Sequence, residues 1–178
     1  YVDGRIRADG VRTFLASRDI AADAALVERI ASQKNDLFVD LVKRDGAVVL
    51  PGARELLGAL RAAGLGVGLF TASRNAGLVL GTAGLLEAFD ARVDGNVAAA
   101  ENLTGKPAPD LPLAAAARLG VAPQRCALFE DAVAGIEAGR AGGFARVVGV
   151  AEGADADKLI AAGADETVPS LAHVTLTA

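Results

Sequence analysis

The sequence predicts an α/β fold in which a doubly wound parallel sheet is joined to a small helical cap. From residue 47 onward, short apolar runs alternate with segments of helical periodicity, the pattern of strands linked by crossover helices. Residues 1–46 show helical periodicity without a convincing buried strand. The chain has 178 residues and is 52% hydrophobic, which is enough for a packed core. We therefore expect a partial helical cap at 1–46 and an α/β core at 47–178.

The cap is expected to contain helices, because apolar residues recur at helical spacing within 11–15 and 25–41, before a break at 44–46. In the core, short apolar runs predict strands at 67–70, 89–93, 125–129, 145–150 and 166–168. Helices are predicted to run over 52–63, 110–119 and 155–162 and to begin near 76 and 133, and 97–104 is expected to be a loop. Asp110 is expected to cap its helix, with Pro112 in the first turn.

Charge and composition exclude several classes of protein. The chain has 22 acidic and 18 basic residues, a net charge of −4, so no nucleic-acid surface is indicated. Cys126 is the one cysteine and is expected within an apolar strand, which favours a reducing compartment. No apolar run of 18 residues and no signal peptide is present. We therefore expect a soluble cytoplasmic protein without a membrane partner, a monomer or a weak oligomer.

The first candidate site follows the first core strand. Thr71 comes directly after that strand and leads through Ala72, Ser73, Arg74 and Asn75 into a helix. A hydroxyl and backbone N–H groups at a helix N-terminus form a ready site for a phosphate. The alternative is that Thr71 and Ser73 only cap the helix.

The second candidate is Lys106, in Gly105-Lys106-Pro107-Ala108-Pro109-Asp110. The two prolines fix their own φ angles, so this rigid frame could aim the ammonium inward at phosphoryl charge. The alternative is an exposed lysine in a proline turn, which is the commoner fate of a lysine.

The third candidate is the acid pair Glu130-Asp131, at the end of the apolar run 126–129. Two carboxylates are costly to bury unless they are paired or hold a cation, which indicates a hard metal such as Mg²⁺. The alternative is a pair of acids favoured by the helix dipole. Because ligands bind at the carboxyl ends of strands in open α/β sheets, we expect hydroxyl, lysine and acids to converge on one edge.

Together these motifs resemble those of the haloacid dehalogenase-like superfamily, in particular its β-phosphoglucomutase-like branch, whose members carry a helical cap. Thr71 matches the family's Ser/Thr motif, Lys106 its lysine motif and Glu130-Asp131 its acidic metal motif. The likeness covers 51–169 and extends only weakly into the cap.

In the cap, Arg7 and Lys34 fall where mutase-like members carry phosphate-binding bases, although a solvated basic residue is the alternative for each. The resemblance further implies an aspartate nucleophile on a central first strand, a second aspartate as general acid and base, and Mg²⁺ as cofactor. It implies that Thr71 holds a phosphoryl oxygen and that Lys106 offsets negative charge. Asp131 would ligate the metal, and Glu130 would ligate it through water or orient its surroundings.

The motif that would carry that nucleophile, an apolar strand ending in Asp-x-Asp-Gly, is absent from the sequence. Asp155-Ala156-Asp157 has the spacing of the two acids, but Lys158 follows in place of glycine and no strand directly precedes them. We therefore expect an N-terminally truncated form of a longer enzyme, whose core lacks its central first strand and which is inactive by itself.

The favoured function is that of a phosphatase for a small phosphorylated metabolite such as a sugar phosphate. Ala132 stands where mutase-like members often carry serine, which weakens the case for a mutase. A mutase that moves phosphate between sugar hydroxyls, and an inactive fragment or phosphosugar-binding module, are the alternatives.

Overall fold

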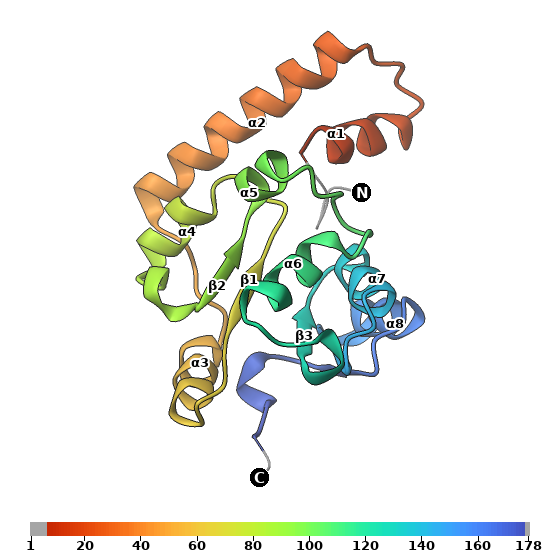
Figure 1. Ribbon diagram of the computed structural model, residues 1–178. Coiled ribbons are helices and arrows are strands. Elements are labelled where there is room, and N and C mark those ends of the chain that lie inside the picture. Colours follow the sequence, from red (N-terminus) through yellow and green to blue (C-terminus); the bar gives the residue numbers. More distant parts are fainter. Residues whose placement is uncertain (1–6, 177–178) are drawn as a thin grey trace.

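The computed structural model describes residues 7–176, which form a pair of cap helices over an α/β core (Figure 1). Helix α1 spans Arg7–Ala16 and helix α2 spans Ala24–Asp45. The two pack through four buried residues: Val11, Leu15, Val27 and Ala31.

Local signals account for both ends of α2. The Asp23 carboxylate accepts a hydrogen bond from the Leu26 N–H at 2.7 Å, which caps the start of the helix. At the other end, Gly46 adopts φ +76 and donates its N–H to the Val42 carbonyl. Helix α2 therefore ends beside the predicted domain boundary between 1–46 and 47–178. The division into two domains stays a prediction.

The described strands pair in parallel, as predicted, and form two sheets. Strands β1 (Gly68–Phe70) and β2 (Ala91–Val93) form one sheet. The other sheet has the order β3-β4-β5, with bounds Ala127–Glu130, Arg146–Val150 and Glu166–Val168. Among the described strands, β1 therefore pairs only with β2, and β3 pairs with β4 alone.

Phe70 connects the two sheets, because its ring packs against both of the core's hydrophobic clusters. One cluster is centred on Leu128, Ile136 and Val147, and the other on Val93 and Leu111. The side chains of Ile136, Val147, Val93 and Leu111 are fully buried. The two sheets are thus packed as one core although no strand hydrogen-bonds across them in the described part of the chain.

Helices connect and cover the strands, as expected for parallel pairing. They are α3 (Ala53–Ala62), α4 (Ala76–Ala83), α5 (Gly95–Ala100), α6 (Asp110–Arg118), α7 (Val133–Ala141) and α8 (Gly153–Ala161), with 3₁₀ turns at Leu86–Ala88, Pro123–Arg125 and Leu171–His173. None of the helices in the described residues is long and apolar enough to cross a membrane.

Three local predictions were wrong. The expected loop at 97–104 begins as α5, because Asp94 Oδ1 accepts hydrogen bonds from the N–H groups of Asn96 and Val97, at 2.9 and 3.0 Å, and caps a run of alanines. Asp110 is the first residue of α6 rather than its cap, and its carboxylate accepts from the Thr104 N–H. Cys126 lies just before β3, with its thiol directed to a backbone carbonyl.

Candidate active site

The loop between β1 and α4 presents two hydroxyls that are already held by its own backbone. Thr71 Oγ1 accepts a hydrogen bond from the Ser73 N–H at 3.2 Å, and Ser73 Oγ accepts from the Asn75 N–H at 3.1 Å. A hydroxyl that accepts one hydrogen bond keeps its own proton to donate. Both hydroxyls therefore stiffen the loop and remain able to donate to a phosphoryl oxygen.

The turn from β2 into α5 braces this loop from behind. The Gly95 N–H donates to the Ser73 carbonyl at 2.9 Å, and Asn96 Nδ2 donates to the Arg74 carbonyl at 2.9 Å. A Cβ at position 95 would lie only 2.5 Å from the Ala72 carbonyl oxygen. Position 95 therefore needs glycine for the close approach of the two segments.

Lys106 is buried between the two sheets. Its Nζ forms an ion pair with Glu130 Oε1 and lies 5.3 Å from the centre of the Phe70 ring. The side chains of Lys106 and Glu130 are only 6% and 9% exposed. Since Phe70 ends β1 and Glu130 ends β3, the carboxyl ends of both strands meet at this lysine.

The two adjacent acids differ in their hydrogen bonding: the Glu130 carboxylate is occupied by hydrogen bonds, whereas the Asp131 carboxylate is available. Glu130 Oε2 accepts from the N–H groups of Asp131 and Ala132, at 2.9 and 3.1 Å, while Oε1 accepts from Lys106. Loss of water, followed by the neighbouring Glu130 carboxylate, raises the pKa of Asp131 above its usual value, and because Asp131 is exposed, solvent weakens both effects. The charged form of the Asp131 carboxyl group is therefore disfavoured in this structure.

Replacing Asp131 by asparagine is expected to raise the melting temperature at pH 7 by a small amount, because the exposed carboxylate is screened by solvent. Because the folded state raises the Asp131 pKa, it holds that proton more tightly than the unfolded chain does. Unfolding therefore becomes easier as the pH rises above about 4, where unfolded aspartate ionises. Asparagine carries no charge, so the difference in melting temperature between the variant and the wild type should shrink toward pH 4. Thermal melts at both pH values test this, and an equal difference at both would contradict it.

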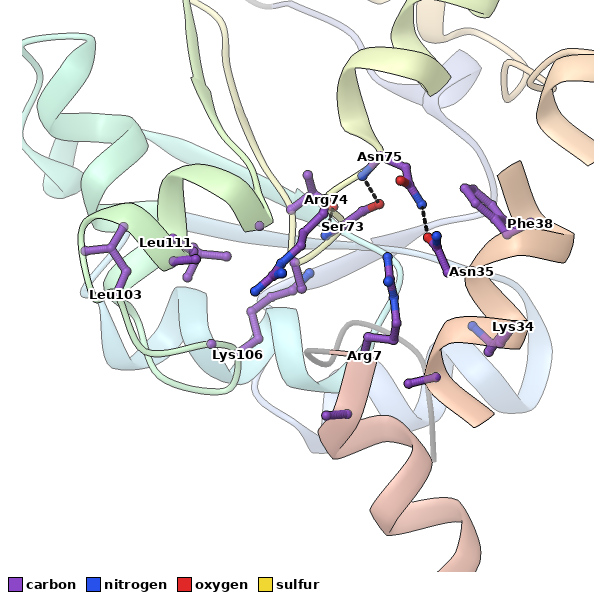
Figure 2. Close-up of a pocket in the computed structure, with 18 of the residues that line it drawn as sticks. Arg7, Lys34, Asn35, Phe38, Ser73, Arg74, Asn75, Leu103, Lys106 and Leu111 are labelled. Atoms are coloured by element: carbon purple, nitrogen blue, oxygen red, sulfur yellow. Dashed lines mark hydrogen bonds between the residues drawn. The ribbon is translucent and has the colours of Figure 1, made fainter. Parts of the chain in front are cut away.

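A cavity of about 460 Å³ lies between the loop, Lys106 and the cap helices (Figure 2). Eight of the ten residues predicted for the site line it: Arg7, Lys34, Thr71, Ala72, Ser73, Arg74, Asn75 and Lys106. Glu130 and Asp131 are not among its lining residues, and Glu130 reaches it only through its ion pair with Lys106. The structure thus brings the predicted hydroxyl and lysine to one cavity, whereas Glu130 pairs with the lysine and Asp131 lies exposed outside the lining.

The cap faces this cavity with polar groups that the sequence interpretation only partly identified. Figure 2 shows Arg7 extending from the start of α1 toward the loop that carries Ser73 and Asn75. Asn75 Nδ2 donates to Asn35 Oδ1 at 2.8 Å, which joins the loop directly to α2. Asn35 was missed, although it directly follows Lys34 on α2; it is half-buried, whereas Lys34 and Asp36 on either side of it are exposed.

The described residues fit a divalent cation site only in part. Within 7–176, no group of three His, Cys, Asp or Glu side chains is placed to hold a metal ion. Both Glu130 oxygens already accept hydrogen bonds, so Asp131 supplies the pair's available carboxylate. A hard cation usually takes six or more oxygens, including water. These residues can therefore contribute one ligand to a site that needs further oxygen donors.

Comparison with known proteins leads to the same family that the sequence motifs resemble, the haloacid dehalogenase-like hydrolases. The model for haloacid dehalogenase-like hydrolases matches residues 4–143. The chain is 45% identical to a β-phosphoglucomutase of Mycobacterium bovis over 186 residues, covering 98% of this chain and 71% of that protein. It is 31% identical to hexitol phosphatase A of Escherichia coli over 180 residues, covering 99% and 76%.

Solved structures agree with the sequence comparisons. A β-phosphoglucomutase from Clostridium difficile superposes with a TM-score of 0.82 at 28% identity, covering 98% of this chain and 75% of that one. The chain belongs to the haloacid dehalogenase-like hydrolases and resembles their β-phosphoglucomutase-like branch. Phosphatases and phosphomutases of this superfamily generally use Mg²⁺.

Proposed function

We propose that this chain supplies the phosphate-binding part of a phosphoryl-transfer enzyme that acts on a small phosphorylated metabolite such as a sugar phosphate. The observation that supports this best is the single cavity of about 460 Å³ in which Thr71, Lys106 and Arg7 all take part. Its volume falls in the range of ordinary small-molecule sites. Its three donors come from a strand end, a loop and the cap, as a phosphorylated ligand enclosed by both domains would require.

The chemistry assigned to each residue follows from its hydrogen bonds. Thr71 donates its hydroxyl proton to a phosphoryl oxygen, and Lys106 offsets the charge that develops during transfer. Glu130 holds Lys106 in place, and Asp131 contributes a carboxylate to the cation. Mg²⁺, when bound, neutralises phosphoryl charge. The sequence-derived assignment of Glu130 and Asp131 to a metal site is kept here as a proposal, with Glu130 in the orienting role.

The cap side of the cavity is assigned to the remainder of the substrate. Arg7 and Lys34 bring two cations from α1 and α2, opposite Arg74 on the loop. Ser73 and Asn75 add hydroxyl and amide donors between them. This mixture of charged and neutral donors suits an anionic sugar whose hydroxyls need hydrogen-bond partners.

Two activities remain as candidates, a phosphatase and a mutase, and they differ in the molecule or group that accepts the phosphoryl group. A phosphatase uses water, and the similarity to hexitol phosphatase A together with Ala132 supports it. A mutase uses a second sugar hydroxyl, and the 45% identity to a β-phosphoglucomutase supports it. Products formed from β-glucose 1-phosphate by the whole product of the gene separate them: inorganic phosphate indicates the phosphatase and glucose 6-phosphate the mutase.

The 178-residue chain alone is proposed not to turn over phosphate esters. Among residues 7–176, Glu28 is the one acid that lines the cavity, and it belongs to the cap helix α2 rather than to a strand end. We expect inorganic phosphate to bind, measured by calorimetry, without Mg²⁺-dependent release of phosphate from sugar phosphates. Robust turnover by the 178-residue chain that is lost in Lys106→Ala would contradict its proposed inactivity. If the whole gene product binds phosphate without turnover, that result would instead support a binding module.

A further inference from the structure

Glu130 is folded over the first turn of α7 instead of extending from the end of β3. Its carboxylate accepts three hydrogen bonds, two from the backbone N–H groups of Asp131 and Ala132 and one from Lys106. Ala132, the N-cap residue of α7, has no side chain that can cap the helix. Glu130 is thereby held from the backbone side and in turn holds the lysine.

This position of Glu130 depends on the absence of a side chain at Gly135. A Cβ built on Gly135 would overlap the carboxyl group and Cγ of Glu130. Gly135 lies in the first turn of α7, and it is not among the glycines with positive φ. Its backbone conformation is therefore open to any residue, and the need for space explains the glycine.

The position of Glu130 affects the cavity through Lys106. A lysine side chain has four rotatable bonds, and its ammonium has no preferred position unless a partner holds it. Lys106 lines the cavity, whereas Glu130 and Gly135 do not. Both therefore act on a bound anion through the lysine.

We propose that Gly135 is a positioning residue for the phosphate site: the space it leaves lets Glu130 hold the Lys106 ammonium at the cavity. The effect on phosphate rests on the proposed function, whereas the placement of Lys106 does not. In Gly135→Ala, Glu130 is displaced from the first turn of α7, and Lys106 loses the partner that orders it.

The first test is phosphate binding. Titration calorimetry of the 178-residue chain with inorganic phosphate should show about a tenfold weaker affinity in Gly135→Ala, typical of losing one charge-assisted hydrogen bond. In a Lys106→Ala background the same change should have no further effect, because coupled residues are not additive. Unchanged or tighter binding, or an equal loss in both backgrounds, would overturn the proposal.

Gly58→Ala is the matched control, since Gly58 lies within α3 and a Cβ there meets no atom within 4 Å. The Lys106 ammonium provides a readout independent of phosphate. Its ¹H–¹⁵N signal, assigned by its absence in Lys106→Ala, should be seen in the wild type and in Gly58→Ala and lost in Gly135→Ala. If the wild type does not bind phosphate, the proposed function fails while this signal still tests the placement of Lys106; a signal that persists in Gly135→Ala would overturn that placement.

Thermal melts keep the proposal testable if Gly135→Ala folds poorly. Alanine is a better helix former than glycine, so Gly135→Ala should stabilise the protein once Glu130 no longer needs the space. The Glu130→Ala, Gly135→Ala variant should therefore melt higher than Glu130→Ala, whereas Gly135→Ala alone should melt lower than the wild type. The same sign of change in both backgrounds would show that Glu130 and Gly135 do not compete for space.

Discussion

Replacing Lys106 by alanine is expected to lower the free energy of unfolding by about 3–5 kcal/mol, the usual cost of removing one partner from a buried ion pair. The reason is the position of Glu130, whose side chain is 9% exposed and would lose the cation with which it pairs. Urea denaturation at pH 7 measures the change.

An exposed ion pair in the same chain provides the comparison. Lys158 pairs with Asp155 at 2.7 Å, but their side chains are 65% and 75% exposed. Lys158→Ala should therefore cost less than about 1 kcal/mol. Removing both buried partners, in Lys106→Ala with Glu130→Ala, should recover part of the loss because no uncompensated charge remains. Equal costs for the two lysines would show that the Lys106–Glu130 pair is not buried in solution.

Much of the fold could be predicted because the signals are local. The strand ending at Phe70, the strand ending at Glu130 and the helices after them follow from short apolar runs with polar ends. Thr71 and Lys106 were proposed as site residues on similar grounds, since Thr71 directly follows a strand and Lys106 directly precedes a proline, and both line the cavity. The cap residues Arg7 and Lys34 were proposed from family resemblance and do line the cavity.

The parts that the sequence could not predict depend on distant contacts. Gly135 looks like an ordinary helix glycine until Glu130 is seen folded onto it. Asn35 is one polar residue among several on α2, and only its bond to Asn75 distinguishes it. Pairing between strands is likewise invisible to periodicity, and a gap in the sheet was expected only because the family resemblance implies a central strand that the sequence lacks.

That gap leads to the prediction with the largest effect on activity. Among the described strands, β1 and β3 each keep one edge without a strand partner, and their carboxyl ends meet at Lys106. An extended peptide can add to exposed sheet edges through backbone hydrogen bonds. We expect a peptide with four to five apolar residues followed by Asp-x-Asp-Gly, supplied at millimolar concentration, to bind parallel to both strands.

Binding of this peptide should slow hydrogen exchange at the amides of β1 and β3 that do not pair with β2 or β4. It should also raise the melting temperature, because a ligand that binds only the folded state stabilises it. With Mg²⁺ and β-glucose 1-phosphate present, it should produce the turnover that we propose the chain alone lacks, since its first aspartate brings a nucleophile to the end of the cavity occupied by Lys106. A peptide with asparagine in place of that aspartate should protect the same amides without turnover. If neither peptide changes exchange in β1 or β3, these edges do not accept a strand, and the proposed cause of inactivity has to be sought elsewhere in the chain.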